Sequence, residues 1–176
     1  TEVYPNDARA YNNIATIEYA KGNYDVAKQY AQKALAVNSS NGEANANLGL
    51  IALKQGDVKA AENYIAKAGN ANGVSEVLGN LHLAQGKYAQ AEQDFGKTVS
   101  NSAALAQLLN KNYQAAAQTL SNIKNGDATT DYLKAVLYAR QGNNSAAATA
   151  LKSAISKDSS YASYAANDLE LSKVSK

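Results

Sequence analysis

The chain has 176 residues, of which 45% are hydrophobic and one is proline, so its composition is that of a folded globular protein. Its formal net charge is +2, and its 17 Lys and Arg residues are spread singly from Arg9 to Lys176, so no basic stripe is predicted to bind nucleic acid or an anionic membrane. No apolar run reaches the roughly 18 residues of a membrane span. Without Cys there is no disulfide, thiolate nucleophile or Cys-based zinc site. We expect a soluble domain.

The first predicted element is a helical hairpin around Gly22. Apolar residues recur at helical spacing before this glycine, at Ile14 and Ile17, and after it, at Ala27 and Ala31. A glycine at the turn supplies the left-handed conformation that ends the first helix, and the polar residue after it can cap the next. Ala27 is required to be small because the two helices approach most closely there. The pattern therefore predicts a helix, a tight turn and a second helix.

The same phrase recurs along the chain. Further copies centre on Gly56, Gly86 and Gly142, at a distance of 34 residues from 22 to 56 and of 30 from 56 to 86. Another copy, at 110–113, has lost its glycine. Each copy has an alanine at the position that corresponds to Ala27, namely Ala61, Ala91, Ala116 and Ala147. A period of this length is typical of stacked helical repeats.

This pattern resembles the tetratricopeptide repeat, whose unit of about 34 residues is matched through Tyr11, Gly22, Tyr24 and Ala27. The resemblance implies an all-α fold, a right-handed α-solenoid of about five helical hairpins with a C-terminal capping helix. It divides one continuous repeat domain into the tail of an upstream repeat or linker at 1–7, repeats at 8–41, 42–71 and 72–100, a short degenerate repeat at 101–127, a fifth repeat at 128–160 and the capping helix at 161–176.

Departures from the repeat carry further expectations. Pro5 stands where the last proline of a preceding repeat would lie, and the chain has no Met, so we expect a fragment or a processed product. The fourth unit is compressed, which leaves a first helix of about two turns at 103–110. Residues 69–73 form a loop between the second and third units. The stretch 101–158 is similar to the degenerate last repeats of envelope-associated proteins of Bacteroidetes, which implies a periplasmic or cell-envelope location.

Catalytic and metal chemistry find little support in the sequence. His82, the sole histidine, stands where the repeat usually places a Tyr between its two helices, and we interpret it as a packing residue. A catalytic base would need a nucleophile or carboxylate partner that the spacing does not reveal. Asp57, Asp94 and Asp127 are not arranged as a calcium loop, and 69–73 lacks the lysine of a phosphate loop. We predict no enzyme activity, no cofactor and no metal.

The resemblance implies that the first helices of successive repeats line a concave groove that binds a peptide or protein segment. Asparagine side chains there can satisfy both the N–H and the C=O of an extended peptide. A merely solvated face stays the alternative for each residue. The implied peptide-binding residues are Arg9, Asn12, Asn13, Thr16, Tyr19, Asn47, Leu50, Lys54, Glu76, Asn80, Tyr132 and Arg140.

Two functions follow as hypotheses. The first is a non-catalytic scaffold for protein–protein interaction that holds its partner in the groove. Capture of a chaperone's C-terminal carboxylate is not expected, since Asn47 alone matches the residues that family members use for it. The second is a structural spacer or self-association module of a larger cell-envelope protein, which associates through its N-terminal face.

Overall fold

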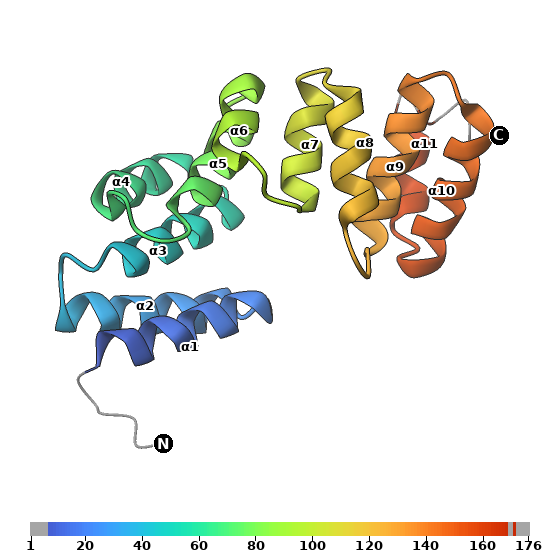
Figure 1. The fold of residues 1–176 in the computed structure, drawn as a ribbon. Helices are drawn as coiled ribbons and strands as arrows, with labels where there is room; N and C mark the ends of the chain where they lie inside the picture. The colour runs from blue at the N-terminus through green and yellow to red at the C-terminus, as the bar shows by residue number, and fades with distance from the viewer. Residues whose placement is uncertain (1–6, 169–170, 172–176) are drawn as a thin grey trace. The chain divides into compact units, whose positions relative to one another are not determined.

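The computed structural model describes residues 7–168 and residue 171. These residues form helices and no strand, so the expected all-α class is confirmed (Figure 1). The helices are α1 Ala8–Ala20, α2 Tyr24–Val37, α3 Gly42–Lys54, α4 Val58–Ala68, α5 Val74–Ala84, α6 Tyr88–Phe95, α7 Asn101–Leu109, α8 Tyr113–Asn122, α9 Ala128–Arg140, α10 Asn144–Lys157 and α11 Tyr161–Asn167. None of the helices among the described residues has the length and apolar character that a membrane span requires.

The chain divides into two compact units, Thr1–Asp94 and Phe95–Lys176. In the first unit α1 packs against α2 and α3 against α4, and α3 also contacts α1 and α5. In the second unit α7 packs against α8, α9 against α10, and α11 against α10. The repeat boundaries derived from the sequence stay a prediction, and Pro5 lies outside the described residues.

The turns of the hairpins have the backbone conformation that the repeated glycines predict. Gly22, Gly56, Gly86 and Gly142 have φ values of 82, 79, 75 and 77°. Lys111 stands at the corresponding position of the copy that lacks glycine, and its φ of 63° is also left-handed. The turn is therefore kept where glycine is lost, although a side chain is strained in this conformation.

The small residue after each turn is fully buried. Ala27 is 0% exposed. The same value holds at the corresponding positions, Ala61, Ala91, Ala116 and Ala147. Full burial at every copy is what a contact between the paired helices at this residue requires.

The polar residue after the turn caps the next helix in three copies. Side-chain oxygens of Asp57, Asn112 and Asn143 accept hydrogen bonds from the backbone N–H three residues later, at 3.0, 3.3 and 3.1 Å. Asn23 does not follow this expectation: its side chain makes no capping hydrogen bond to α2, and its amide donates to the Glu18 carboxylate at 2.7 Å. The Asn23 side chain is thus held by the end of α1 and does not cap α2.

Glycines within α3 let the helices of the first unit approach closely. A Cβ at Gly49 would lie 3.2 Å from Cγ1 of Val77 on α5 and 3.4 Å from Cγ1 of Ile65 on α4. A Cβ at Gly42 would come within 2.6 Å of the Ala68 carbonyl oxygen. These close approaches hold α3 against α4 and α5 and bring Val77 against α3.

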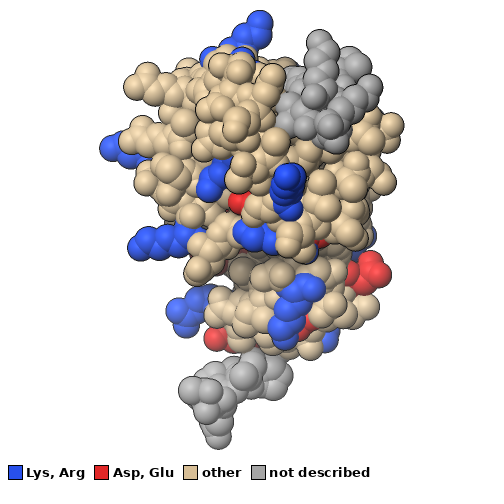
Figure 2. All heavy atoms as spheres, turned by 90° about the vertical axis from the view of Figure 1, so that its right-hand side faces the viewer, with Lys and Arg blue, Asp and Glu red and all other residues tan. Residues whose placement is uncertain are grey.

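Charged side chains on the surface are dispersed. On the face that Figure 2 draws, Lys and Arg form single side chains or small groups among mainly uncharged surface. Several pair with nearby carboxylates, as Lys157 does with Asp131 at 2.8 Å and Lys21 with Glu18 at 3.6 Å. In both pairs the basic side chain is exposed and the carboxylate is mostly covered.

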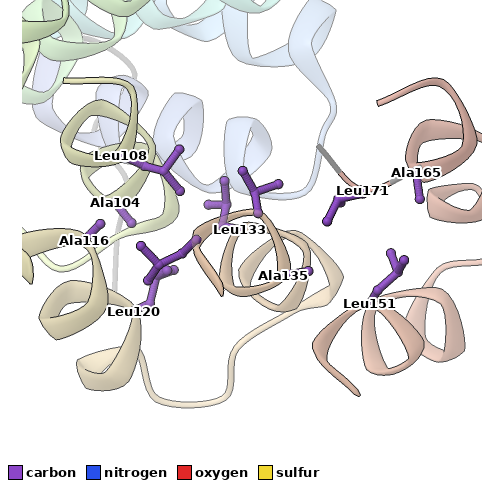
Figure 3. Close-up of a cluster of buried hydrophobic side chains, with 11 residues drawn as sticks. Ala104, Leu108, Ala116, Leu120, Leu133, Ala135, Leu151, Ala165 and Leu171 are labelled. Carbon is purple, nitrogen blue, oxygen red and sulfur yellow. The ribbon is translucent and has the colours of Figure 1, made fainter. Parts of the chain in front are cut away.

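The core of the second unit joins side chains from all its helices (Figure 3). Leu108 of α7, Leu120 of α8 and Leu133 of α9 meet on one side, and Leu151 of α10 meets Leu171 on the other. Ala165 of α11 is also buried in this cluster. The expected capping helix at 161–176 lies in part outside the described residues; within them α11 ends at Asn167, and Asp168 is extended.

Candidate functional site

A pocket of about 340 Å³ lies over the first helices α1, α3 and α5 of the first unit. It is lined by Asn12, Asn13, Thr16, Glu43, Ala46, Asn47, Leu50, Asn72, Gly73, Glu76 and Val77. Six of these residues are among the implied groove residues: Asn12, Asn13, Thr16, Asn47, Leu50 and Glu76. The structure thus brings half of the implied residues into one hollow.

A chain of hydrogen bonds joins α1 to α3 along this pocket. Asn12 is 4% exposed, and its amide donates to Oε2 of Glu43 at 3.1 Å. Its Oδ1 accepts a hydrogen bond from the Asn47 amide at 2.6 Å. The Asn47 amide also donates to Oγ1 of Thr16 at 3.2 Å, and Thr16 in turn donates to the Asn12 carbonyl oxygen at 3.1 Å. The polar wall of the pocket is therefore held in place before any partner arrives.

Helical spacing explains why these four side chains meet. Asn12 and Thr16 are one turn apart on α1, and Glu43 and Asn47 are one turn apart on α3, so each pair shares one helix face. The two helices pack against each other, which places the two faces in contact. Glu43 was not identified from the sequence, although its position four residues before Asn47 would have placed it on the same face.

The pocket combines carboxylates with one partly exposed apolar side chain, that of Leu50. Glu43 and Glu76, both exposed, lie in the first turns of α3 and α5, whose partly positive N-termini stabilise a negative charge there. Ala46 and Val77 are buried, and Leu50 is partly buried. Tyr19 lies near this site: burial, followed by the charges of Tyr24 and Glu76, raises the pKa of its phenol to about 12, so the phenol stays neutral.

Four implied residues of the first unit do not line the pocket. Arg9 is exposed beside Asp7, with Nε 4.0 Å from the carboxylate. Tyr19 packs against Tyr24 with ring centroids 5.4 Å apart. Lys54 is exposed in the last turn of α3, and Asn80 donates to the Glu76 carbonyl oxygen at 3.0 Å.

The two implied residues of the second unit make contacts within that unit. The Tyr132 hydroxyl donates to Oδ2 of Asp168 at 2.9 Å, and its ring lies 4.9 Å from that of Tyr161. Nη1 of Arg140 donates to the Leu108 carbonyl oxygen at 3.0 Å. These contacts tie α9 to the segment after α11 and to α7, and neither residue lines the pocket.

His82 has a carboxylate partner that the sequence analysis did not reveal. Its Nδ1 contacts Oδ2 of Asp94, and the two side chains are 21% and 22% exposed. The pair connects α5 to α6, as expected of a residue that packs between the helices of one hairpin. The spacing did not reveal this partner because the two residues are twelve positions apart and meet only across a helix, turn and helix.

The second unit has a pocket of its own. In the second unit a pocket of about 380 Å³ lies between the segment 96–99 and helices α7 and α8. In its wall the Thr119 hydroxyl donates to the Gln107 side-chain oxygen at 2.7 Å. Among residues 7–168 and 171, no group of three or more His, Asp or Glu side chains is arranged to hold a metal ion.

Residues 12–75 match the family model described as tetratricopeptide repeat. A solved tetratricopeptide repeat protein from Parabacteroides merdae is 17% identical to this chain. The alignment covers 96% of this chain and 71% of the Parabacteroides chain, with a TM-score of 0.64. A thermophilic tetratricopeptide repeat protein from Thermus thermophilus is 19% identical. The alignment covers 89% of this chain and 98% of the Thermus chain, with a TM-score of 0.65.

A third solved structure, YrrB, described as a tetratricopeptide repeat protein with an unusual peptide-binding site, is 23% identical over 93% of each chain, with a TM-score of 0.54. No curated protein matches the sequence significantly. At these identities the structural likeness establishes the fold, which is that of the tetratricopeptide repeat proteins.

Proposed function

We propose that this protein is a non-catalytic scaffold that binds an extended segment of another protein in the groove over α1, α3 and α5. The observation that supports this most is the fixed row of asparagine and threonine side chains beside the partly exposed Leu50. Helical repeat proteins use concave surfaces of this kind for binding. The likeness to YrrB, whose description names a peptide-binding site, adds support.

The polar row suits the backbone of a peptide because amide groups both donate and accept. Asn12, Asn47 and Thr16 hold one another, so little side-chain entropy is lost when a partner binds. Asn13 and Asn72 are exposed at the pocket and available for contact. No nucleic acid, metal or cofactor is part of this proposal.

A test blocks the pocket without disturbing the buried hydrogen bonds. Selection of a random ten-residue peptide library displayed on phage should enrich peptides on the wild-type protein and not on the double variant Asn13→Tyr, Asn72→Tyr. The matched control carries Gln29→Tyr and Gln32→Tyr, both exposed on α2. Equal enrichment on wild type and blocked variant, with equal melting temperatures, would move the binding surface elsewhere.

Self-association is the second candidate, because large apolar side chains are exposed on the first hairpin. Ile17 on α1 is 53% exposed and Val26 on α2 is 39% exposed. In this reading the array is a spacer that joins copies through its N-terminal face. Sedimentation at increasing concentration should then show dimers in the wild type and monomers in Ile17→Ser, Val26→Ser.

We also propose a periplasmic or cell-envelope location. It is supported by the low content of charged residues, 18%, and by the similarity of 101–158 to repeats of envelope-associated proteins. Fractionation of the source cells with an antibody against the chain tests this proposal, and recovery in the cytoplasm alone would contradict it.

A further inference from the structure

The charges that line the pocket have one sign. Glu43 and Glu76 contribute carboxylates, and the lining contains no Lys, Arg or His. Within residues 7–168 and 171, neither carboxylate forms an ion pair with a basic side chain. This differs from the dispersed surface pairs such as Lys157 with Asp131. A partner in the groove therefore meets two carboxylates that the protein itself leaves without a counter-charge.

The helix N-termini offset only part of this charge. Each terminus carries the equivalent of about half a positive charge, so the two together leave about one net negative charge at the pocket. Glu43 is also held in place, because Oε2 accepts a hydrogen bond from the buried Asn12 amide at 3.1 Å. A fixed carboxylate binds a cation at a smaller entropic cost than a freely rotating one.

The Leu50 side chain fits the apolar part of a cationic side chain. Lysine and arginine carry several methylene groups before the charged end, and these groups cover apolar surface while the charge stays with polar partners. Leu50, which is partly exposed, supplies that surface next to the carboxylates, with the buried Ala46 and Val77 behind it. A carboxylate on the partner would instead be repelled.

We propose that the groove selects an extended protein segment that carries a lysine or arginine, whose stem packs on Leu50 and whose charged end is bound by Glu43 and Glu76. This inference rests on the proposed function and narrows its partner. The competing explanation is that the two carboxylates serve only the helix N-termini, and the experiment separates these readings.

The test uses the same random ten-residue phage library, selected on wild type, on Glu43→Gln, Glu76→Gln and on a control, Asp25→Asn, Glu62→Gln. The control removes two exposed carboxylates from α2 and α4, outside the pocket. We expect Lys and Arg to be enriched over Asp and Glu on wild type and control. The groove variant should bind the best cationic peptide about tenfold more weakly, with a smaller dependence on salt.

The outcomes are distinct. Peptides that need an open pocket but are neutral or acidic would overturn the charge inference and leave the proposed function standing. Cationic peptides that bind the groove variant as tightly as wild type would also overturn it, since the carboxylates then serve only the helices. If wild type enriches no more peptides than the protein blocked at Asn13 and Asn72, the proposed function fails and this inference fails with it.

Discussion

The side-chain amide of Asn47 on α3 donates a 2.6 Å hydrogen bond to Oδ1 of Asn12 on α1, although the two residues are 35 positions apart in the sequence. Asn12 is almost fully buried and has a donor and an acceptor in use, so it belongs to the packing between two hairpins as well as to the pocket wall. The pair therefore links the stability of the first unit to the shape of its groove.

Asn47→Ala should lower the free energy of unfolding by about 1–3 kcal/mol, because it leaves the buried Asn12 oxygen without its donor. Asn13→Ala, on the same helix as Asn12 but exposed, should change it by less than about 0.5 kcal/mol. Urea unfolding of both variants measures the contrast. Equal values for the two would mean that the hydrogen bond between the hairpins contributes nothing.

Ala27→Arg should destabilise the fold by about 3–5 kcal/mol or prevent folding, because it forces a charged side chain into a fully buried helix contact. Ala36→Arg, on an exposed position of the same helix, is the matched control and should melt within a few degrees of wild type. Thermal unfolding followed by circular dichroism compares the two. A near-normal melt of Ala27→Arg would contradict the alignment of the repeats.

Lys111→Gly should stabilise the protein by about 0.5–1 kcal/mol, because it removes the strain of a side chain at φ 63°. The reverse change, Gly22→Ala, should cost about 1 kcal/mol through φ alone, since a Cβ there meets nothing within 4 Å. Denaturant midpoints of both variants provide the test. A stabilising Gly22→Ala would show that the turns do not need their left-handed conformation.

Asp127, the N-cap of α9, should make stability depend on pH in the acid range. The backbone N–H of Thr130, followed by the side chains of Asn101 and Thr130, lowers the pKa of its carboxyl below the ordinary value despite some burial. A carboxyl whose pKa is lower when folded stabilises the protein above the unfolded pKa, about 3.9, and loses this contribution as the pH falls through the folded pKa.

Asp127→Asn, which still accepts a capping hydrogen bond but does not titrate, is the matched comparison. Its deficit in unfolding free energy relative to wild type should be largest near pH 6 and should shrink towards pH 2. Urea titrations across that range measure it. A deficit that stays constant, or one that grows in acid, would contradict the assignment.

The repeated turns could be predicted from the sequence because each depends on a local requirement. A left-handed turn favours glycine and a close helix contact requires alanine, so spacing alone located both. Lys111 keeps the left-handed backbone conformation of these turns although it is not a glycine. Asn23 shows its limit, because a carboxylate five residues earlier competes for the side chain.

Only about half of the pocket could be predicted from the sequence, because its residues come from different hairpins. The resemblance implied that Asn12, Asn47 and Glu76 face inward, but not that Asn47 and Glu43 would form hydrogen bonds with Asn12. Tyr132 and Arg140 occupy inward register positions too, yet α9 uses them for contacts within its own unit. Such competition between partners depends on the packed structure and leaves no trace in the spacing.

The most direct test of the central claim, that the groove over α1, α3 and α5 is the binding surface, is an NMR titration with the tightest peptide from the library. The largest shifts should fall on the side-chain amides of Asn13, Asn47 and Asn72 and on the Leu50 methyl groups. Largest shifts on α2 and α4, or on residues 96–122, would contradict the claim.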